Sequence, residues 1–317
     1  MNGLDKYISY YHADPQGFLN YRSKWYANAE ELLYLQIETN SHCNLSCPMC
    51  IHSIGYSKTR SMDKTVFDRI MEDVVDMAIP SVSMNQVNEP LLDKKIFGRI
   101  KAIAELDCVK DVMMNTNATL LNEESSRKII DSGLIRLWIG FDGYKKETYE
   151  KMRRGASYEQ VFSNVINFLE LKEKLNARLP VVRLSFVKTK INIGEISDFK
   201  EFWYDKVDYL AFQDFVPPSL TRSDQEIALE LTEKRTADKK RLCGQPFERL
   251  IVRGDGSVLP CCFHYATSMV MGNILDANLR SIWHSKKMAA LRQSLLTDGW
   301  KHNSICSNCI KGLYGML

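Results

Sequence analysis

Three cysteines of this chain are spaced so that their thiolates could bind a cluster of metal ions. Residues 38–50 contain them in the pattern C-x3-C-x2-C, at Cys43, Cys47 and Cys50. A [4Fe–4S] cluster has four irons, so three thiolates would leave one iron open to a small chelating molecule. Structural zinc sites close with four ligands and usually come from paired C-x2-C segments, so this spacing fits zinc poorly. The sequence therefore predicts an iron–sulfur cluster with one open coordination position.

A second group of cysteines lies near the C-terminal end of the sequence. It consists of one isolated cysteine, an adjacent pair and a C-x2-C pair, namely Cys243, Cys261, Cys262, Cys306 and Cys309. Four of these thiols could bind a second [4Fe–4S] cluster with no iron left open. Four of them could instead form a structural zinc site, so both kinds of metal centre remain open here.

Composition and charge exclude several classes of function. The chain has 317 residues, 45% of them hydrophobic, and a formal net charge of +3, too small to indicate nucleic-acid binding. No apolar run approaches the roughly 18 residues needed to span a membrane, and the first residues show no signal-peptide core. Nine cysteines without a secretory signal favour metal sites in a reducing compartment. We therefore expect a cytoplasmic protein with no membrane and no nucleic-acid partner.

Apolar spacing over residues 33–216 alternates between strand-like and helix-like segments. Val66, Ile70 and Val74, for example, recur at helical spacing. Strands that alternate with helices favour an α/β fold with a parallel sheet wrapped by helices. Six or seven such units are present, fewer than a closed eightfold barrel requires. The expected strands are 33–37, 82–84, 109–114, 135–141, 181–187 and 207–212, and the expected helices are 63–77, 95–105, 123–132, 158–175 and 196–204.

Composition also divides the chain into regions. A turn signal at 254–257 predicts a hairpin in the cysteine-rich region, and a helix is expected to begin at Leu279. The expected regions are an N-terminal extension at 1–32, an α/β domain at 33–216, a polar linker at 217–241 with a helix over 224–231, and a small cysteine-rich domain at 242–317.

The first cysteine set and the segments after the expected strands resemble the radical S-adenosylmethionine (SAM) superfamily, over roughly residues 33–311. The resemblance implies a partial (β/α)6 TIM-like barrel followed by a small iron–sulfur domain of the SPASM or twitch type. It also implies two [4Fe–4S] clusters and SAM as cofactors. In that superfamily SAM chelates the open iron, and its reductive cleavage gives a 5′-deoxyadenosyl radical that removes a hydrogen atom from a C–H bond. Met49, directly before Cys50, holds the position that usually packs on the adenine.

Two polar segments that follow strands resemble the superfamily's SAM-binding segments. Residues 85–92 resemble the glycine-rich turn that holds the SAM ammonium group, with Asn88 in place of glycine and Glu89 as an acceptor. Asparagine tolerates the left-handed backbone that glycine would otherwise provide. Residues 115–121 resemble a T-N-G-T-L-L segment, which implies that Thr116 and Asn117 reach the ribose or the substrate.

An arginine is expected to bind the SAM carboxylate. Residues 153–158 resemble an R-G-x-x-S-F/Y segment whose arginine pairs with that carboxylate, a group that a guanidinium matches bidentately. The alignment selects Arg154 and leaves Arg153 as a solvated neighbour. Gly140 stands where a ribose-contacting serine is common.

The second cysteine group resembles the twitch-type domain of the butirosin-pathway aminocyclitol dehydrogenase. Its intervals imply that one auxiliary cluster is bound by Cys243, Cys261, Cys306 and Cys309. Cys262 is then a spare thiol, an alternative ligand to Cys261, or a hydrogen-atom donor to a substrate radical.

Three hypotheses about function follow. In the first, a small hydroxyl-rich substrate such as a sugar, aminocyclitol or nucleotide sugar is dehydrogenated at a carbinol carbon, or epimerised there with Cys262 as donor. In the second, a ribosomally made peptide is oxidised, crosslinked or epimerised; the short segment before the first strand favours the small substrate. In the third, the chain is a non-catalytic iron–sulfur carrier.

Two further expectations belong to the enzyme hypotheses. We expect a flavodoxin- or ferredoxin-type reductant as partner. Gln213 and Asp214 follow the last expected strand and should face the barrel mouth, where Asp214 could act as the base for a substrate hydroxyl.

Overall fold

The structure, a computed structural model, describes residues 31–55, 61–218 and 243–314. Within them the strands form one nine-stranded sheet in the order β6-β5-β4-β3-β2-β1-β7-β8-β9. Neighbours from β6 to β7 run parallel, whereas β8 pairs antiparallel with β7 and β9. The strands are β1 (Tyr34–Ile37), β2 (Ser81–Ser83), β3 (Asp111–Thr116), β4 (Arg136–Gly140), β5 (Val181–Lys188), β6 (Tyr209–Asp214), β7 (Arg249–Val252), β8 (Ser257–Leu259) and β9 (Gly272–Asn273).

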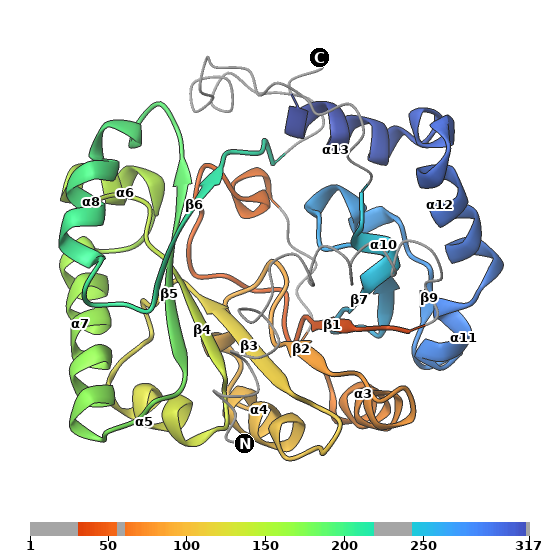
Figure 1. The fold of residues 1–317 in the computed structure, drawn as a ribbon, viewed down its shortest axis with the longest axis horizontal. Helices are drawn as coiled ribbons and strands as arrows, with labels where there is room; N and C mark the ends of the chain where they lie inside the picture. Colours follow the sequence, from red (N-terminus) through yellow and green to blue (C-terminus); the bar gives the residue numbers. More distant parts are fainter. Residues whose placement is uncertain (1–30, 56–60, 219–242, 315–317) are drawn as a thin grey trace.

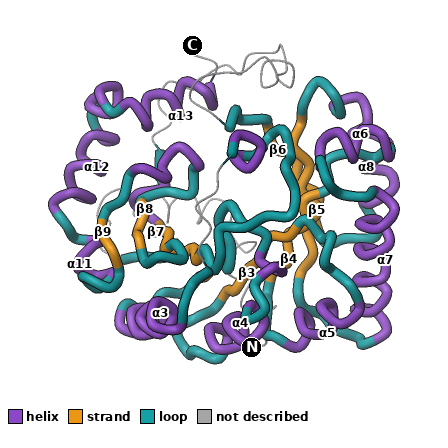
Figure 2. The backbone as a smooth tube through the Cα atoms, turned by 180° about the vertical axis from the view of Figure 1, so that it is seen from behind, coloured by secondary structure: helices purple, strands orange, loops and turns teal. Residues whose placement is uncertain are grey.

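Helices α3 to α8 lie outside the curved sheet, and the cysteine loop after β1 lies within its curve (Figures 1 and 2). Helices α10 to α13 lie beside β7, β8 and β9 at the other end of the sheet. No helix in the described ranges is long and apolar enough to cross a membrane. The helices are α3 (Lys64–Asp76), α4 (Ile96–Ala104), α5 (Glu123–Asp131), α6 (Lys146–Met152), α7 (Tyr158–Lys174), α8 (Ile196–Trp203), α10 (Gln245–Glu248), α11 (Leu279–Trp283), α12 (Lys286–Leu296) and α13 (Ser304–Tyr314).

The expected partial (β/α)6 barrel is confirmed. A helix connects each of the strands β1 to β5 to the next parallel strand, and the expected elements agree with the observed ones to within two residues at either end. Helix α6 was not predicted, because only Tyr149 and Met152 of its seven residues are buried and the others are polar. Most of the expected extension at 1–32 and the expected helix at 224–231 lie outside the described residues.

Side chains of the barrel strands alternate between an apolar outer face and a polar inner face. On β1, Leu35 and Ile37 belong to the core beneath the helices, whereas Gln36 points inward and donates to the Asn85 carbonyl. The interior is therefore lined by groups that can bind a polar ligand.

A buried ion pair closes the amino-terminal end of the barrel. Arg136 on β4 donates through Nε to Oδ1 of Asp111 on β3 at 2.8 Å, and a second contact joins Nη2 to Oδ2. Both side chains are 5% exposed, and the hydroxyl of Ser81 donates to the same carboxylate. Since this bidentate pair fills the floor, the usable space lies at the carboxyl ends of the strands.

Strand β1 joins the barrel to the cysteine-rich region. Tyr34 on β1 pairs with Ser81 of β2 on one side and with Arg249 of β7 on the other. The two regions also meet at their helices, where Asp73 on α3 accepts the Leu279 N–H at the start of α11 at 2.9 Å. The strands after residue 243 thus extend the barrel sheet, with the predicted hairpin at β7–β8.

Candidate active site and cluster sites

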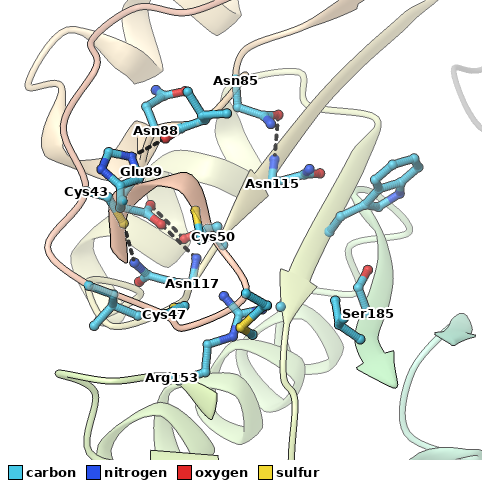
Figure 3. Close-up of a pocket in the computed structure, with 18 of the residues that line it drawn as sticks. Cys43, Cys47, Cys50, Asn85, Asn88, Glu89, Asn115, Asn117, Arg153 and Ser185 are labelled. Atoms are coloured by element: carbon cyan, nitrogen blue, oxygen red, sulfur yellow. Dashed lines mark hydrogen bonds between the residues drawn. The ribbon is translucent and has the colours of Figure 1, made fainter. Parts of the chain in front are cut away.

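A cavity of about 320 Å³, here called the first cavity, lies at the carboxyl ends of the barrel strands. Its wall includes all three cysteines of the first set, the turn after β2 and residues of β3 to β6. Figure 3 shows Cys43, Cys47 and Cys50 on one side and Ser185 of β5 on the other. Active sites of β/α barrels lie at this end of the strands. The structure thus gathers the predicted ligands around one space.

The cysteine loop turns so that its three thiols border the first cavity. The Cys50 N–H donates to the Cys47 carbonyl at 2.9 Å, and the short helix η1 (Ile51–Ile54) begins directly afterwards. Burial raises the pKa of Cys47 to about 12, and it raises the pKa values of Cys43 and Cys50 as well. Such thiols keep their protons until a metal cation offsets the cost of burying thiolates. Three thiols around one space fit the predicted [4Fe–4S] cluster.

The carboxylate of Glu89 fixes the turn beside the cysteine loop. Its Oε1 accepts from the Thr116 hydroxyl at 2.8 Å and the Leu91 N–H at 3.1 Å, and its Oε2 accepts from the Asn117 N–H at 2.7 Å. The side chain is 1% exposed, and burial raises its pKa although these donors oppose the shift. Both oxygens of Glu89 already accept hydrogen bonds from the protein. The expected contact of Glu89 with the SAM ammonium group stays a prediction.

The amide of Asn117 connects this turn to the first cysteine. Its Oδ1 accepts a backbone N–H two residues on, so Nδ2 is the atom that lies 3.8 Å from Cys43 Sγ and 2.9 Å from Asn44 Oδ1. Thr116 and Asn117 both line the first cavity, and their expected contact with the ribose or the substrate stays a prediction. Polar groups in a buried turn must be satisfied locally, and here they hold the cysteine loop in place.

Arg153, and not Arg154, enters the first cavity. Arg153 Nε lies 2.5 Å from Oδ2 of Asp142, and the two side chains are 16% and 0% exposed. Arg154 is exposed and meets the cysteine loop through its carbonyl, which accepts the Ser46 N–H. The prediction that Arg153 is the solvated neighbour was wrong. The prediction failed because helix α6, which was not predicted, ends at Met152 and directs the Arg153 side chain inward.

Gly140 provides the space that Arg153 occupies. A Cβ at this position would lie 2.6 Å from the Arg153 Cζ and would overlap the guanidinium. At the position where the superfamily commonly has a ribose-contacting serine, Gly140 therefore leaves room for an arginine from another element. The sequence signal for this close approach was a glycine at the end of a strand whose other side chains are large.

Two buried polar atoms in the cavity wall lack a hydrogen-bond partner among the described residues, Asn88 Nδ2 and Asn115 Oδ1. The orientation of Asn88 is fixed, because its Oδ1 accepts the Gln86 N–H at 2.9 Å. Buried polar groups are normally satisfied by a ligand or by water. A polar, charged molecule such as SAM fits this wall, which also contains Met49 beside the cysteines.

The wall opposite the cysteines is built from the inner faces of β4, β5 and β6. Arg183 Cζ lies 3.3 Å from the centroid of the Trp138 ring, and its Nε donates to Ser185 Oγ at 3.1 Å. Gln213 of β6 lines the same cavity. Sequence reasoning did not select Trp138, Arg183 or Ser185. The sequence signal that could have found the β5 residues is alternation, because Arg183 and Ser185 stand at every second position of a strand whose other positions are apolar.

Asp214 lies on the other face of β6. It pairs in register with Lys188, and its Oδ1 lies 2.7 Å from Lys188 Nζ. Phe212, two residues earlier and so on the same face, packs against Phe199 of helix α8. The expectation that Asp214 faces the barrel mouth is corrected, because alternation along the strand sends only Gln213 inward.

The predicted auxiliary ligands surround a second cavity of about 80 Å³. Burial raises the pKa of Cys306 to about 11 and raises the pKa values of the other three thiols. The thiols surround one space, which fits a cluster whose irons each bind one thiolate. The cysteines that line the cavity are Cys243, Cys261, Cys306 and Cys309.

Cys262 points away from this cavity. Its Sγ lies 3.8 Å from Nη1 of Arg249, whose guanidinium pairs with Glu248 and lies over the Tyr34 ring. Neither of the two cavities described here includes Cys262 in its wall. The adjacent residues send their side chains to different sides, so Cys261 faces the second cavity and Cys262 does not. The role of Cys262 as hydrogen-atom donor stays a prediction.

Substitutions of this adjacent pair should therefore differ. Cys261→Ala is expected to remove the second cluster and with it about half of the bound iron, whereas Cys262→Ala retains the iron of the unmodified protein. Iron analysis and absorption spectra after anaerobic reconstitution measure this difference. The reverse result, with iron lost from Cys262→Ala alone, would make Cys262 the ligand.

A buried acid lies where the cysteine loop leaves the sheet. Glu38, directly after β1, has an Oε2 3.4 Å from Nε of Arg253 and an Oε1 with no hydrogen-bond partner among the described residues. Burial raises the pKa of Glu38 to about 7 and outweighs the attraction of Arg253. The folded protein therefore holds this proton more tightly than the unfolded chain does.

The stability of the protein should consequently fall as the pH rises from about 4.5 to about 7. Over pH 5 to 8 we expect the unmodified protein to lose about 2–3 kcal/mol of unfolding free energy more than Glu38→Gln loses. Denaturant unfolding of both proteins at the two pH values measures this difference. Parallel pH profiles would show that Glu38 ionises normally in the fold.

Two family models match the chain. Residues 37–199 match the radical SAM superfamily, and residues 243–310 match SPASM, an iron–sulfur cluster-binding domain. Among curated proteins, GTP 3′,8-cyclase of Peptoclostridium acidaminophilum is 26% identical over 189 residues, which are 58% of this chain and 55% of that protein. The probable GTP 3′,8-cyclase of Methanocaldococcus jannaschii is 27% identical over 189 residues, 59% and 60% of the two chains. The chain thus matches less than two thirds of the length of these relatives.

Solved structures share the fold. BtrN in complex with AdoMet and 2-DOIA has a TM-score of 0.58 at 21% identity, over 88% of this chain and 92% of that chain. Streptococcus suis SuiB bound to S-adenosylmethionine has a TM-score of 0.66 at 16% identity, over 83% and 68% of the two chains.

Proposed function

Because the chain belongs to the radical SAM superfamily and carries a SPASM-type iron–sulfur domain, we propose that it oxidises a small, hydroxyl-rich substrate at a carbinol carbon. Its cofactors are [4Fe–4S] clusters and SAM. The substrate class that we propose is a sugar, an aminocyclitol or a nucleotide sugar. Epimerisation at the same carbon is the redox-neutral form of this reaction.

The first cavity supplies the residues that would hold the cofactors. Cys43, Cys47 and Cys50 would bind the first cluster, and Met49 would lie against the adenine. Arg153 takes the place proposed for Arg154 as the receptor of the SAM carboxylate, since its guanidinium is oriented by Asp142 inside the cavity. When bound, the cluster and SAM supply a 5′-deoxyadenosyl radical that removes a hydrogen atom from a C–H bond.

One observation carries the proposal of a hydroxyl-rich substrate. The cavity wall opposite the cysteines presents donors and acceptors together, from Asn115, Arg183, Ser185 and Gln213. A hydroxyl both donates and accepts, so a polyhydroxylated molecule can satisfy such a mixed wall where a hydrocarbon side chain would leave its groups unpaired. Trp138 adds an apolar surface for the face of a ring.

The proton of the substrate hydroxyl needs an acceptor other than Asp214, which faces away. Within the described part of the wall the acidic residue is Glu89, and its oxygens already accept three hydrogen bonds. Water in the cavity mouth is the acceptor that we propose for this proton. A basic side chain is not required, because an alcohol carbon that has lost a hydrogen atom releases its hydroxyl proton readily.

The test is anaerobic reconstitution with iron and sulfide, followed by turnover with SAM and a flavodoxin-type or chemical reductant. The candidates are sugars, aminocyclitols, nucleotide sugars, GTP and short peptides, each deuterated at the carbon to be oxidised. We expect deuterium to move into 5′-deoxyadenosine and a ketone to form with a hydroxyl-rich candidate. Deuterium transfer from a peptide alone, or from GTP with cyclisation, would replace the proposed substrate class.

A further inference from the structure

The two cavities are joined by a continuous chain of hydrogen bonds. Gln86 follows β2 and lines the first cavity, and its Nε2 donates to the Cys262 carbonyl at 2.9 Å. The Cys262 N–H donates in turn to Oε1 of Gln245 at 3.0 Å, and Gln245 lines the second cavity. On the other side, Asn88 Oδ1 accepts the Gln86 N–H at 2.9 Å. Four residues therefore connect one ligand space to the other.

The orientation of each amide in this chain is determined by its partner. A backbone carbonyl only accepts, so the atom of Gln86 that meets Cys262 is the NH2 group. A backbone N–H only donates, so the atom of Gln245 that meets Cys262 is the oxygen. No alternative flip of either side chain preserves these contacts.

Strand β8 runs antiparallel to β7, so the segment after β8 leaves the sheet toward the amino-terminal end of the barrel strands, whereas the turn after β2 lies at their carboxyl end. Residues 176 positions apart meet here because the segment after β8 turns back toward the barrel, where it contacts Gln86. That segment contains Cys261, which faces the second cavity, and Cys262, whose carbonyl faces Gln86. The Cys262 carbonyl is thus held from the barrel side by Gln86, and the Cys262 N–H is held by Gln245.

We propose that Gln86 is a positioning residue that holds the Cys261–Cys262 segment against the first cavity. In this position the segment would allow electron transfer between the substrate and the auxiliary cluster. The inference rests on the proposed oxidation. In that oxidation the carbinol carbon would give up one hydrogen atom and the hydroxyl would release its proton, and an oxidised auxiliary cluster held by Cys243, Cys261, Cys306 and Cys309 would accept the remaining electron. The one electron that SAM cleavage takes up would equal the one that substrate oxidation returns.

The contact should also affect the reduction potential of the auxiliary cluster. The N–H of Gln86 places the positive end of a dipole beside a segment that carries a cluster ligand, which favours the more negative, reduced cluster. Gln86→Ala removes this dipole and should lower the potential. Gln86→Glu keeps the size of the side chain but introduces a negative charge, and should lower the potential further.

The experiment is a redox titration of the reconstituted holoprotein, followed by electron paramagnetic resonance without SAM or substrate. The auxiliary cluster should have its highest potential in the unmodified protein, a lower one in Gln86→Ala and the most negative one in Gln86→Glu. Gln213→Glu is the matched control, because Gln213 lines the first cavity from β6, at the opposite end of the sheet from β7 to β9. Its auxiliary-cluster potential should equal that of the unmodified protein.

A second readout follows the backbone directly. Hydrogen exchange of the peptide containing 261–263 should be faster in the Gln86→Ala holoprotein and unchanged in Gln213→Glu. Unaltered potentials together with unaltered exchange would overturn the inference. Failure of the proposed function has a different readout, because the unmodified protein would then transfer no deuterium from a hydroxyl-rich candidate to 5′-deoxyadenosine.

Discussion

Gly140→Ala is expected to lower the free energy of unfolding by up to about 3–5 kcal/mol, the range for breaking a buried ion pair. The added Cβ would overlap the guanidinium of Arg153. An exposed arginine would simply swing away, but this one pairs with Asp142, whose carboxylate is completely buried. Displacing the cation leaves that buried carboxylate without its ion-pair partner and with the Val187 N–H as its remaining donor among the described residues. Anaerobic denaturant unfolding measures the loss, and binding of SAM should weaken at least tenfold in parallel.

A double-mutant cycle shows whether Gly140 acts through Arg153. If it does, Gly140→Ala adds little to the loss already caused by Arg153→Ala, and Asp142→Asn restores part of the stability because it removes the buried charge. Additive losses would mean that the glycine matters for another reason, such as the backbone of β4.

Glu89→Ala is expected to lower the free energy of unfolding by about 2–6 kcal/mol, because the backbone N–H groups of Leu91 and Asn117 lose their acceptor in a buried turn. The same turn holds Cys43 and Asn44 through the amide of Asn117. Reconstitution should therefore fill the second cluster site and leave the first largely empty, so that about half of the iron is lost.

Glu195→Ala is the matched control for this prediction. Glu195 is also a buried acid that accepts three hydrogen bonds, from the N–H groups of Tyr144 and Lys145 and from the Thr148 hydroxyl. Its partners lie at the start of helix α6 and do not hold the cysteine loop. It should lose stability and keep both clusters. Equal iron loss in both variants would attribute the effect to general unfolding.

Local patterns predicted most of the fold. The α/β alternation and the boundaries of β1 to β6 follow from apolar spacing, because each of these strands packs one face against helices that show their own periodicity. The two cysteine groups were equally local signals. The structure places the first group around one cavity and four of the five cysteines of the second group around another, although the sequence carried no information on the distance between the two cavities.

The errors concern side-chain direction. Arg153 and Arg154 are adjacent, and only the end of an unpredicted helix decides which of them points inward. Asp214 differs from Gln213 by one position, and an extension of β6 by two residues beyond the expected end determines its face. Such choices depend on register, since a shift of one residue reverses the face of every side chain on a strand.

The pairing of β1 with β7 could not be predicted, because both are short apolar strands far apart in the sequence. It has a practical consequence for anyone who wishes to study the barrel alone. Deleting the residues from 243 onward would uncover the whole hydrogen-bonding edge of β1, a central strand without the charges or prolines that protect natural edges. Such a shortened chain should self-associate through that edge, so insolubility of the fragment would not reveal what the second cluster contributes to chemistry.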